Sequence, residues 1–245
     1  MKAMIFAAGL GTRLKPFTDN KPKALFPVCG KPLLDHIIRK LLAAGFNDIV
    51  INVHHFSDLI IEYLDECAGL NVNIEISREQ NLLDTGGGIK KVAGFFDDGK
   101  PFLVHNVDII SNVDLEGFYL SHLKRKDALA SLLVNDRKST RYFLMDDDRL
   151  AGWMNVVSGE IKSPFATVNS EIYRKMAFGG VHVMSPIVFE YMHNWPDKFS
   201  IIDFYLSVAA KISIYGFCPE NLQLVDVGKS ENLPAAELLC MSLQK

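Results

Sequence analysis

Cysteine is scarce in this 245-residue sequence, and the few present lack the spacing of a zinc site or a disulfide framework. The four cysteines lie far apart, at Cys29, Cys67, Cys218 and Cys240, with no C-x-x-C pair. The seven histidines show no metal-ligand spacing either. Scattered cysteines of this kind are typical of reduced thiols in cytosolic proteins. We therefore expect all four to be packing residues.

An excess of positive charge and long apolar runs are also missing. The formal net charge is −3, so no broad positive field is available to hold a nucleic acid. The apolar run at residues 3–8 is too short for a signal peptide or a membrane helix. We expect a cytoplasmic protein that binds neither nucleic acid nor membrane, and the oligomeric state stays open.

The hydrophobic pattern predicts an α/β fold with a mixed, mainly parallel sheet in a Rossmann-like three-layer α/β/α arrangement. In the first half, strands are expected at 3–7, 49–53, 72–76 and 102–105, and helices at 31–45, 58–66 and from 84. Residues 128–154 indicate antiparallel hairpins with turns at 135–136 and 146–148. Later strands are expected at 180–184 and 222–227, and helices at 187–193, 201–210 and 231–243. No internal repeat or linker interrupts this order, so one domain is expected.

Glycines cluster directly after the first expected strand, in the segment F-A-A-G-L-G-T-R-L-K-P-F-T at residues 6–18. Gly9 and Gly11 let backbone N–H groups approach a polyphosphate, and Arg13 adds a cation suited to phosphate oxygens. The segment is neither a dinucleotide fingerprint, since Leu14 stands where the third glycine is needed, nor a P-loop. It predicts a site for an anion.

A proline-rich segment with two lysines, K-P-K-A-L-F-P-V, begins at Lys21 and ends at residue 28. The prolines stiffen it, so Lys23 can be held close to a triphosphate with little freedom to lose. Further along, Asp108 follows the strand at 102–105, and a carboxylate at the carboxyl end of a strand is typical of ligand sites in open α/β sheets.

Taken together, the segments at 1–18 and 21–32 resemble the sugar-phosphate nucleotidyltransferase family, also called the sugar-nucleotide pyrophosphorylases. The L-D-T-G-G-G-I segment at 83–89 most resembles the N-acetylmuramate 1-phosphate uridylyltransferase and mannose 1-phosphate guanylyltransferase-like subgroups. The resemblance implies a fold of the nucleotide-diphospho-sugar transferase type. It also implies a single nucleotidyltransferase domain over 1–245, with an NTP-binding half at 1–127 and a sugar-phosphate-binding half at 128–245.

The resemblance also implies roles for individual residues. Arg13 and Lys23 would be catalytic, Arg13 stabilising the departing pyrophosphate and Lys23 the charge on the α-phosphoryl group. Asp108 and Asp226 would bind Mg²⁺. The nucleotide-binding residues would be Ala7, Ala8, Gly9, Gly11, Thr12, Arg13, Lys23, Thr85, Gly86 and Gly87. A crowded helix start is the alternative explanation for the glycines from 86 onward.

The sugar-phosphate site is the least defined part of the resemblance. Its expected residues are Asn106, Lys162 and Gly180, although the double glycine at 179–180 also fits a strand with a bulge. The family's E-K-P motif is not clearly present, and Lys162 is a substitute for its lysine. Val107 stands where the family's N-G-D turn has glycine.

The predicted reaction joins a nucleoside monophosphate from an NTP, UTP or GTP, to a sugar 1-phosphate and releases pyrophosphate, with Mg²⁺ as cofactor. The alternatives are a cytidylyltransferase acting on an alcohol phosphate such as phosphocholine, and a catalytically silent regulatory subunit that binds sugar nucleotides. Glu79 and Gln80 lie near the expected base site. Because the sequence ends soon after Asp226, we expect a monofunctional protein.

Overall fold

The computed structural model describes residues 1–66, 71–165 and 171–243, and these form two compact units. The first unit contains residues 1–82, 104–116 and 221–245, and the second contains residues 83–103 and 117–220. The chain therefore passes from one unit to the other several times, and the units are not consecutive halves of the sequence. No helix in the described part of the chain is long and apolar enough to cross a membrane.

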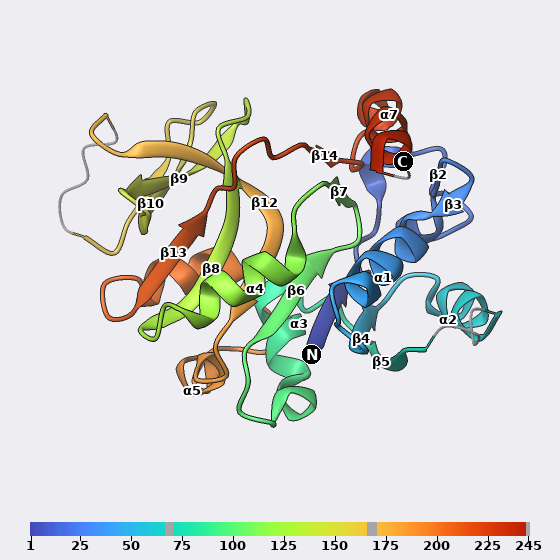
Figure 1. The fold of residues 1–245 in the computed structure, drawn as a ribbon, viewed down its shortest axis with the longest axis horizontal. Helices are drawn as coiled ribbons and strands as arrows, with labels where there is room; N and C mark the ends of the chain where they lie inside the picture. The colour runs from blue at the N-terminus through green and yellow to red at the C-terminus, as the bar shows by residue number, and fades with distance from the viewer. Residues whose placement is uncertain (67–70, 166–170, 244–245) are drawn as a thin grey trace. The chain divides into compact units, whose positions relative to one another are not determined.

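The first unit is built on parallel strands in the order β6-β1-β4-β5 (Figure 1). β1 (Lys2–Phe6) pairs with β4 (Asp48–Val53), and β4 pairs with β5 (Asn73–Arg78), both in parallel. β6 (Phe102–Asn106) begins in the second unit and ends in the first. Nearly continuous apolar residues in β1 and β4 are fully buried, as expected for parallel strands. The predicted α/β pattern is confirmed here.

Helix α1 (Leu33–Ala43) illustrates how local sequence sets the ends of an element. Pro32 caps its start, and Gly45 follows its end with a φ of 79°, a left-handed conformation that glycine adopts without strain. Leu34, Ile37 and Ile38 recur at helical spacing on the buried face. The other helices of this unit are α2 (Ser57–Glu66) and α7 (Leu233–Leu243).

Several short elements of the first unit were not predicted. They include the antiparallel ladder between β2 (Pro27–Val28) and β3 (Lys31–Pro32), and the strand β7 (Ile109–Ser111). β7 pairs antiparallel with β14 (Leu224–Asp226), which lies within the strand predicted at 222–227. The remainder are the 3₁₀ turns η1 (Thr12–Leu14), η2 (Lys23–Leu25) and η4 (Ser230–Asn232). Each is too short to produce a period in the sequence.

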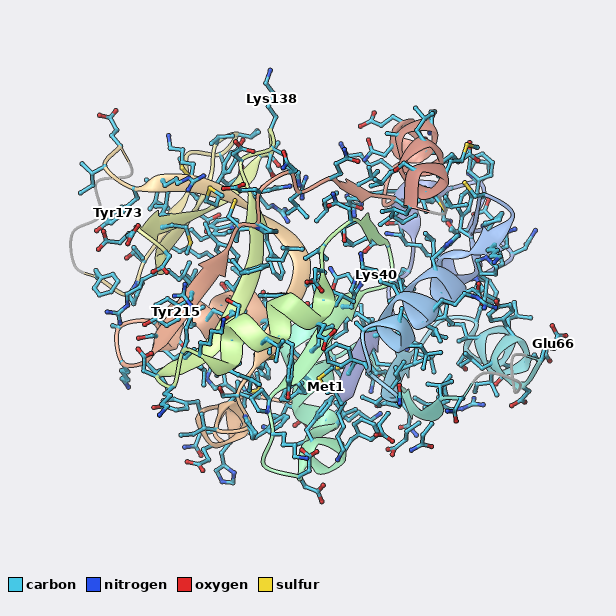
Figure 2. All side chains as sticks on the ribbon, viewed as in Figure 1. Met1, Lys40, Glu66, Lys138, Tyr173 and Tyr215 are labelled. Carbon is cyan, nitrogen blue, oxygen red and sulfur yellow. The ribbon has the colours of Figure 1, made fainter. Side chains whose placement is uncertain are left out.

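Lys40 ties helix α1 to strand β7 within this unit (Figure 2). Its ammonium group donates to the carbonyl oxygen of Ser111 and lies 3.4 Å from the Ser111 Oγ. Burial lowers the pKa of Lys40 to about 8, partly opposed by the negative charge of Asp114. β7 is therefore anchored from the side of α1 as well as by its pairing with β14.

The second unit contains a sheet in which most pairs are antiparallel. Its strands are β8 (Ala128–Asn135), β9 (Arg141–Asp146), β10 (Arg149–Asn155), β11 (Ile161–Lys162), β12 (Arg174–Met184) and β13 (Ser213–Phe217). β8 pairs with β13 in parallel, whereas β12 pairs antiparallel with β8 and with β9. A mixed sheet is confirmed, but the prediction of a mainly parallel one is wrong for this unit.

One of the two predicted hairpins forms. β9 and β10 join through Asp147, whose φ of 52° is a conformation that Asp tolerates in tight turns. The turn at residues 135–136 makes no hairpin, because β8 pairs with β12 and β13 instead of β9. Long-range pairing of this kind leaves no local signal in the sequence.

The helices of the second unit include α3 (Asp84–Lys91), η3 (Ala93–Phe96), α5 (Val188–Met192) and α6 (Ile201–Val208). α4 (Leu115–Leu123) begins in the first unit and was not predicted. Its apolar residues are spread around the helix, so the sequence has no clear amphipathic period there. Stacked rings of Phe96, Phe102 and Phe189 form part of the core of this unit.

The cysteines do not all have the same environment. Cys240 is buried, and the thiol of Cys29 donates to the carbonyl oxygen of Glu237 at 3.4 Å. Cys218 is exposed, so its interpretation as a packing residue is wrong. Cys67 lies outside the described residues.

A buried histidine in the second unit predicts that stability decreases in acid. His122 lies between Ser131, 2.9 Å from its Nδ1, and Ser185, 3.0 Å from its Nε2. Burial, and secondarily the charge of Arg125, lowers the pKa of His122 from 6.5 to about 4. Below pH 6.5, His122 is protonated in the unfolded chain but stays neutral in the folded chain. The free energy of unfolding therefore decreases as the pH falls from 6.5 toward 4. The expected loss is about 3 kcal/mol.

Urea unfolding between pH 8 and pH 4 measures this effect. His122→Gln should flatten the decrease in unfolding free energy across this range, whereas His193→Gln, which changes an exposed histidine, should leave it unchanged. Equal slopes for the wild type and His122→Gln would contradict the assignment. His105, whose pKa is lowered to about 3 by burial, acts in the same direction and is present in every variant.

Candidate functional site

The glycine loop begins where β1 ends, and its first residues are held firmly. Ala7 and Ala8 are 4% and 6% exposed. The Ala7 N–H donates to two acceptors on β4, the Asn52 carbonyl oxygen at 3.2 Å and the Asn52 Oδ1 at 2.9 Å. Gly9 is exposed, and a Cβ there would meet nothing within 4 Å. The start of the loop, at Ala7 and Ala8, is therefore buried and held in place, and the loop becomes accessible to solvent at Gly9.

Gly11 packs tightly against the lysine segment. Its φ of 65° is left-handed, and a Cβ at this position would lie 3.0 Å from Thr18 Cγ2 and 3.2 Å from Lys23 Cβ. The Thr18 Oγ1 donates to the Gly11 carbonyl oxygen at 2.8 Å. Both the conformation and the close contact favour glycine, and they bring the loop against Lys23.

Thr12 and Arg13 lie exposed on the short turn η1, which is anchored by the fully buried Leu14. The guanidinium of Arg13 reaches the region of Gly228, where an added Cβ would lie 2.7 Å from Arg13 Nη2 and 2.6 Å from Asp226 Oδ1. Arg13 and Asp226 therefore come close to one common point, and a residue larger than glycine at position 228 would displace one of them.

Lys23 and Asp108 form an ion pair between the lysine segment and the end of β6. The Lys23 ammonium contacts the Asp108 Oδ2, and the two side chains are only 11% and 17% exposed. Shielding from water strengthens the attraction between such charges. Lys23 begins the turn η2, where the Phe26 N–H donates to the Lys23 carbonyl oxygen at 2.9 Å, so its backbone is fixed as well.

Asp108 and Asp226 start from neighbouring backbone positions. Asp226 is opposite Ile109 in the β7–β14 ladder, and the Val227 N–H donates to the Asp108 carbonyl oxygen at 2.8 Å. The Gly228 N–H donates to Asp226 Oδ1 at 2.6 Å. The structure thus brings together Gly11, Arg13, Lys23, Asp108 and Asp226, which the sequence separates by more than two hundred residues.

Two carboxylates are a donor set that suits a hard divalent cation. Mg²⁺ usually takes one or two protein carboxylates and completes its shell with waters and phosphate oxygens. Within residues 1–66, 71–165 and 171–243, no group of three or more His, Cys, Asp or Glu side chains is arranged to hold a metal. Asp108 and Asp226 therefore fit a cation shared with a phosphate ligand better than a closed protein site.

Asn106 is the last residue of β6, and Val107 begins the turn that leads to β7. Asn106 is half-buried, and its carbonyl oxygen lies 2.8 Å from the Nδ1 of the buried His105. Val107 is 5% exposed, and its N–H donates to the Phe6 carbonyl oxygen at 3.1 Å. The valine that stands where the family has glycine is therefore buried, with its backbone bonded to the end of β1.

The glycines of α3 have a packing role in the second unit. The N–H groups of Gly86 and Gly87 both donate to the Phe199 carbonyl oxygen, at 2.9 and 3.3 Å. A Cβ on Gly87 would lie 1.9 Å from the Asp197 carbonyl oxygen. Thr85 Oγ1 accepts from the Ile201 N–H at 3.0 Å. A crowded helix start therefore accounts for these residues, and their contact with a nucleotide stays a prediction.

Gly86→Ala should destabilise the protein. The new Cβ would lie 2.2 Å from Phe199 Cε2, and this ring is buried beside Trp195 at a centroid distance of 4.8 Å. Overpacking of this kind costs about 1–3 kcal/mol, reduced by the higher helix propensity of alanine. Gly94→Ala is the matched control, because a Cβ there meets nothing within 4 Å. Urea unfolding should show a loss for Gly86→Ala alone, and equal stabilities would contradict the packing role.

The remaining expected sugar-phosphate residues lie in the second unit. Gly180 has a φ of 70° on β12, where the register with β8 shifts between Phe178 and His182, so the predicted bulge is confirmed. Lys162 lies 2.9 Å from Asp203 and 3.7 Å from Glu160. Hydrogen bonding to Asp203 raises the pKa of Lys162, which stays charged but is largely neutralised by these carboxylates.

Sequence reasoning missed three residues that shape this site: Asn52, Thr18 and Gly228. Asn52 interrupts an otherwise apolar strand, and that polar residue is a signal that could have been noticed. Thr18 ends the glycine segment, and Gly228 follows Asp226 after one residue. Thr18 bonds to Gly11, seven residues away in the sequence, and Asn52 bonds to Ala7, 45 residues away. These contacts are visible only in the folded structure.

Comparison with known proteins shows that this chain is similar to nucleotidyltransferases. A family model described as nucleotidyl transferase matches residues 2–158. An N-acetylmuramate alpha-1-phosphate uridylyltransferase of Caulobacter vibrioides is 33% identical over 96% of this chain and 95% of its own. The protein of the same name from Neisseria meningitidis serogroup B is 43% identical over 77% of this chain and 84% of its own.

The fold is shared with solved structures at low sequence identity. A putative glucose-1-phosphate thymidylyltransferase from Bacillus anthracis superposes with a TM-score of 0.81 over 98% of this chain and 94% of its own, at 17% identity. At this identity the likeness shows the fold alone.

Proposed function

Because this chain belongs to the nucleotidyl transferase family, we propose that it transfers a nucleoside monophosphate from an NTP to a sugar 1-phosphate. The products are an NDP-sugar and pyrophosphate. The observation that supports this most directly is the Lys23–Asp108 ion pair, which lies against the glycine loop and beside Asp226. The two relatives described above are both named uridylyltransferases, so UTP and N-acetylmuramate 1-phosphate are the first pair to test.

The main difficulty of this reaction is the alignment of two anions that repel each other. An oxygen of the sugar phosphate attacks the α-phosphorus of the NTP, a new P–O bond forms, and the bond to pyrophosphate breaks. The attacking oxygen already carries negative charge, so no general base is required. Preorganised cations supply the stabilisation, with Lys23 at the α-phosphoryl oxygens and Arg13 at the departing pyrophosphate.

Asp108 and Asp226 would hold Mg²⁺ together with phosphate oxygens of the substrate. The bound ion would supply positive charge that offsets charge on the phosphoryl oxygens. In the substrate-free protein, Asp108 keeps the Lys23 ammonium in place. The backbone N–H groups of Ala8, Gly9, Gly11 and Thr12 would provide the remaining contacts with the triphosphate. The Ala7 N–H is bonded to Asn52, so Ala7 would contact the nucleotide through its other atoms.

Further residues are proposed for the nucleoside and the sugar phosphate. Thr85, Gly86 and Gly87 are proposed to pack against the nucleoside, although their backbone groups also hold α3 to Phe199. Asn106 and Gly180 are proposed to contact the sugar phosphate. For Lys162 the two neighbouring carboxylates argue against a strong phosphate contact, because they compete for its charge.

The organisation of the protein follows the same proposal. Residues 1–245 would act as a single cytoplasmic nucleotidyltransferase domain with a Rossmann-like, three-layer NTP-binding part. The division into an NTP-binding half at 1–127 and a sugar-phosphate-binding half at 128–245 stays a proposal. Residues 221–245, with Asp226, belong to the first compact unit.

A pyrophosphate-release screen tests the proposed function. Four NTPs are combined with N-acetylmuramate 1-phosphate, mannose 1-phosphate, glucose 1-phosphate and phosphocholine, with Mg²⁺ present, and the nucleotide product is identified by mass spectrometry. We expect turnover with UTP. Turnover of CTP with phosphocholine alone would favour the cytidylyltransferase alternative. Binding of an NDP-sugar without turnover of any pair would favour a silent subunit and contradict the proposal.

A further inference from the structure

A buried pair of polar side chains, Asn52 and Glu79, lies directly behind the first residue of the glycine loop. Asn52 is on β4 and 2% exposed, and Glu79 follows β5 and is 5% exposed. The Ala7 N–H donates to Asn52 Oδ1 at 2.9 Å, and Asn52 Nδ2 donates to Glu79 Oε1 at 2.7 Å. A chain of hydrogen bonds therefore runs from a carboxylate to the loop backbone.

The direction of these two hydrogen bonds is fixed by their outer members. The Ala7 N–H can only donate, so the Asn52 atom that faces it must be the oxygen. The amide nitrogen of Asn52 then faces Glu79, and a carboxylate oxygen is a suitable acceptor for it. The Asn52 side chain can satisfy both neighbours in only one orientation.

The pair is not explained by the needs of the sheet. Ile49, Val50, Ile51 and Val53 of the same strand are fully buried and apolar. The Ala7 N–H already has a backbone acceptor in the Asn52 carbonyl oxygen at 3.2 Å. Burying an amide and a carboxylate costs free energy unless each is hydrogen-bonded. The hydrogen bond to Asn52 Oδ1 therefore gives the Ala7 N–H a second acceptor, which an apolar residue at position 52 could not provide.

The backbone around Glu79 is held as well. The Glu79 N–H donates to the Val53 carbonyl oxygen, and the Nδ1 of His54 donates to the Glu79 carbonyl oxygen, both at 2.8 Å. The backbone of Glu79 is thus held in place at the ends of β4 and β5, and this fixes the position from which its carboxylate extends. Asn52 links Glu79 to Ala7, the residue that follows β1 and begins the glycine loop.

We propose that Asn52 and Glu79 are positioning residues for the nucleotide-binding loop, an inference that rests on the proposed function of this loop. The amide fixes the Ala7 N–H, and the direction of the chain at Ala7 sets where the next N–H groups point. Alignment of a triphosphate depends on those directions to within a fraction of an ångström. Glu79 therefore acts on the nucleotide through Asn52. Gln80 is exposed.

Exchanging the amide and the carboxylate tests the pair. In Asn52→Asp, two carboxylates face each other where the wild type has a 2.7 Å hydrogen bond, so the side chain at position 52 is repelled from its place. In the double variant Asn52→Asp with Glu79→Gln, the glutamine amide donates to the carboxylate at position 52 and the Ala7 N–H keeps an acceptor. Glu79→Gln alone keeps an acceptor for Asn52 and is the conservative control.

The expected kinetic effect is selective for the nucleotide. Asn52→Asp should raise the KM for the NTP by about 10- to 100-fold, because a charge-assisted hydrogen bond is lost. The KM for the sugar 1-phosphate should change less than about threefold. The double variant should recover at least about tenfold of the loss in kcat/KM for the NTP. Glu79→Gln keeps the hydrogen bond but removes its charge, so it should raise the KM for the NTP by less than Asn52→Asp does. A double variant no better than Asn52→Asp would overturn the proposal.

Hydrogen exchange in the substrate-free protein gives a readout that does not depend on activity. Amides of residues 7–13 should exchange faster in Asn52→Asp and return to wild-type rates in the double variant. Equal acceleration across β1, β4 and β5, with an unchanged KM for the NTP, would show a merely structural role and overturn the proposal. If the wild type turns over no NTP, the proposed function fails, while the exchange data still decide the positioning of the loop. Should Asn52→Asp not fold, Glu79→Leu removes the same anchor.

Discussion

Lys23→Ala is expected to lower turnover by about 100- to 1,000-fold, the usual effect of removing one preorganised group that stabilises charge in a transition state. The structure gives the physical reason. The Lys23 ammonium is shielded from water, fixed by Asp108 and held on a short turn against Gly11. A cation that needs no reorganisation during the reaction stabilises the α-phosphoryl oxygens more than a mobile surface lysine can.

The matched control is Lys21→Ala, which removes an exposed lysine from the same segment and should leave turnover within about twofold. Steady-state rates of pyrophosphate release measure both variants. Lys23→Ala also leaves the Asp108 carboxylate without its ammonium partner, so a stability loss of about 1–3 kcal/mol is expected and must be measured by urea unfolding. A folded Lys23→Ala protein with normal turnover would contradict the role of Lys23.

The parts of the fold that could be predicted are those with a local cause. β1, α1, β4 and α2 were predicted to within two residues at most ends, because buried parallel strands and amphipathic helices repeat their apolar residues at fixed periods. The antiparallel unit was less predictable. Strand β8 is apolar throughout most of its length and buried along all of it, and nothing in it shows that its partners are β12 and β13.

The candidate site divides in the same way. Gly11 and Lys23 could be predicted together because a glycine-rich segment and a stiff lysine segment follow each other in the sequence. The proximity of Asp226 to Asp108 was predicted only from the family resemblance. The β7–β14 ladder that joins them is three residues long on each side, too short to give a pattern in the sequence. Asn52 was missed because the role of a single polar residue in a strand cannot be inferred until its neighbours across the sheet are known.

Asp226→Asn is expected to abolish most activity and to weaken metal binding without disturbing Lys23. Asparagine keeps an oxygen that can accept from the Gly228 N–H, so the local backbone is preserved. It removes the negative charge that a divalent cation requires, and we expect turnover at about 1 mM Mg²⁺ to fall at least about 100-fold. Titration with Mn²⁺ in the presence of the nucleotide, followed by electron paramagnetic resonance, measures the metal affinity directly.

Asp108→Asn tests the same cation through a residue with two partners. It removes a carboxylate and also releases Lys23, so its loss of turnover should exceed that of Asp226→Asn and should not be recovered by raising Mg²⁺. Asp226→Asn should be partly recovered, because only the metal site is weakened. Asp65→Asn, an exposed change on α2, controls for net charge. If both variants kept wild-type Mn²⁺ affinity, the two carboxylates would not share a cation, and the ion pair of Asp108 would serve only to hold Lys23.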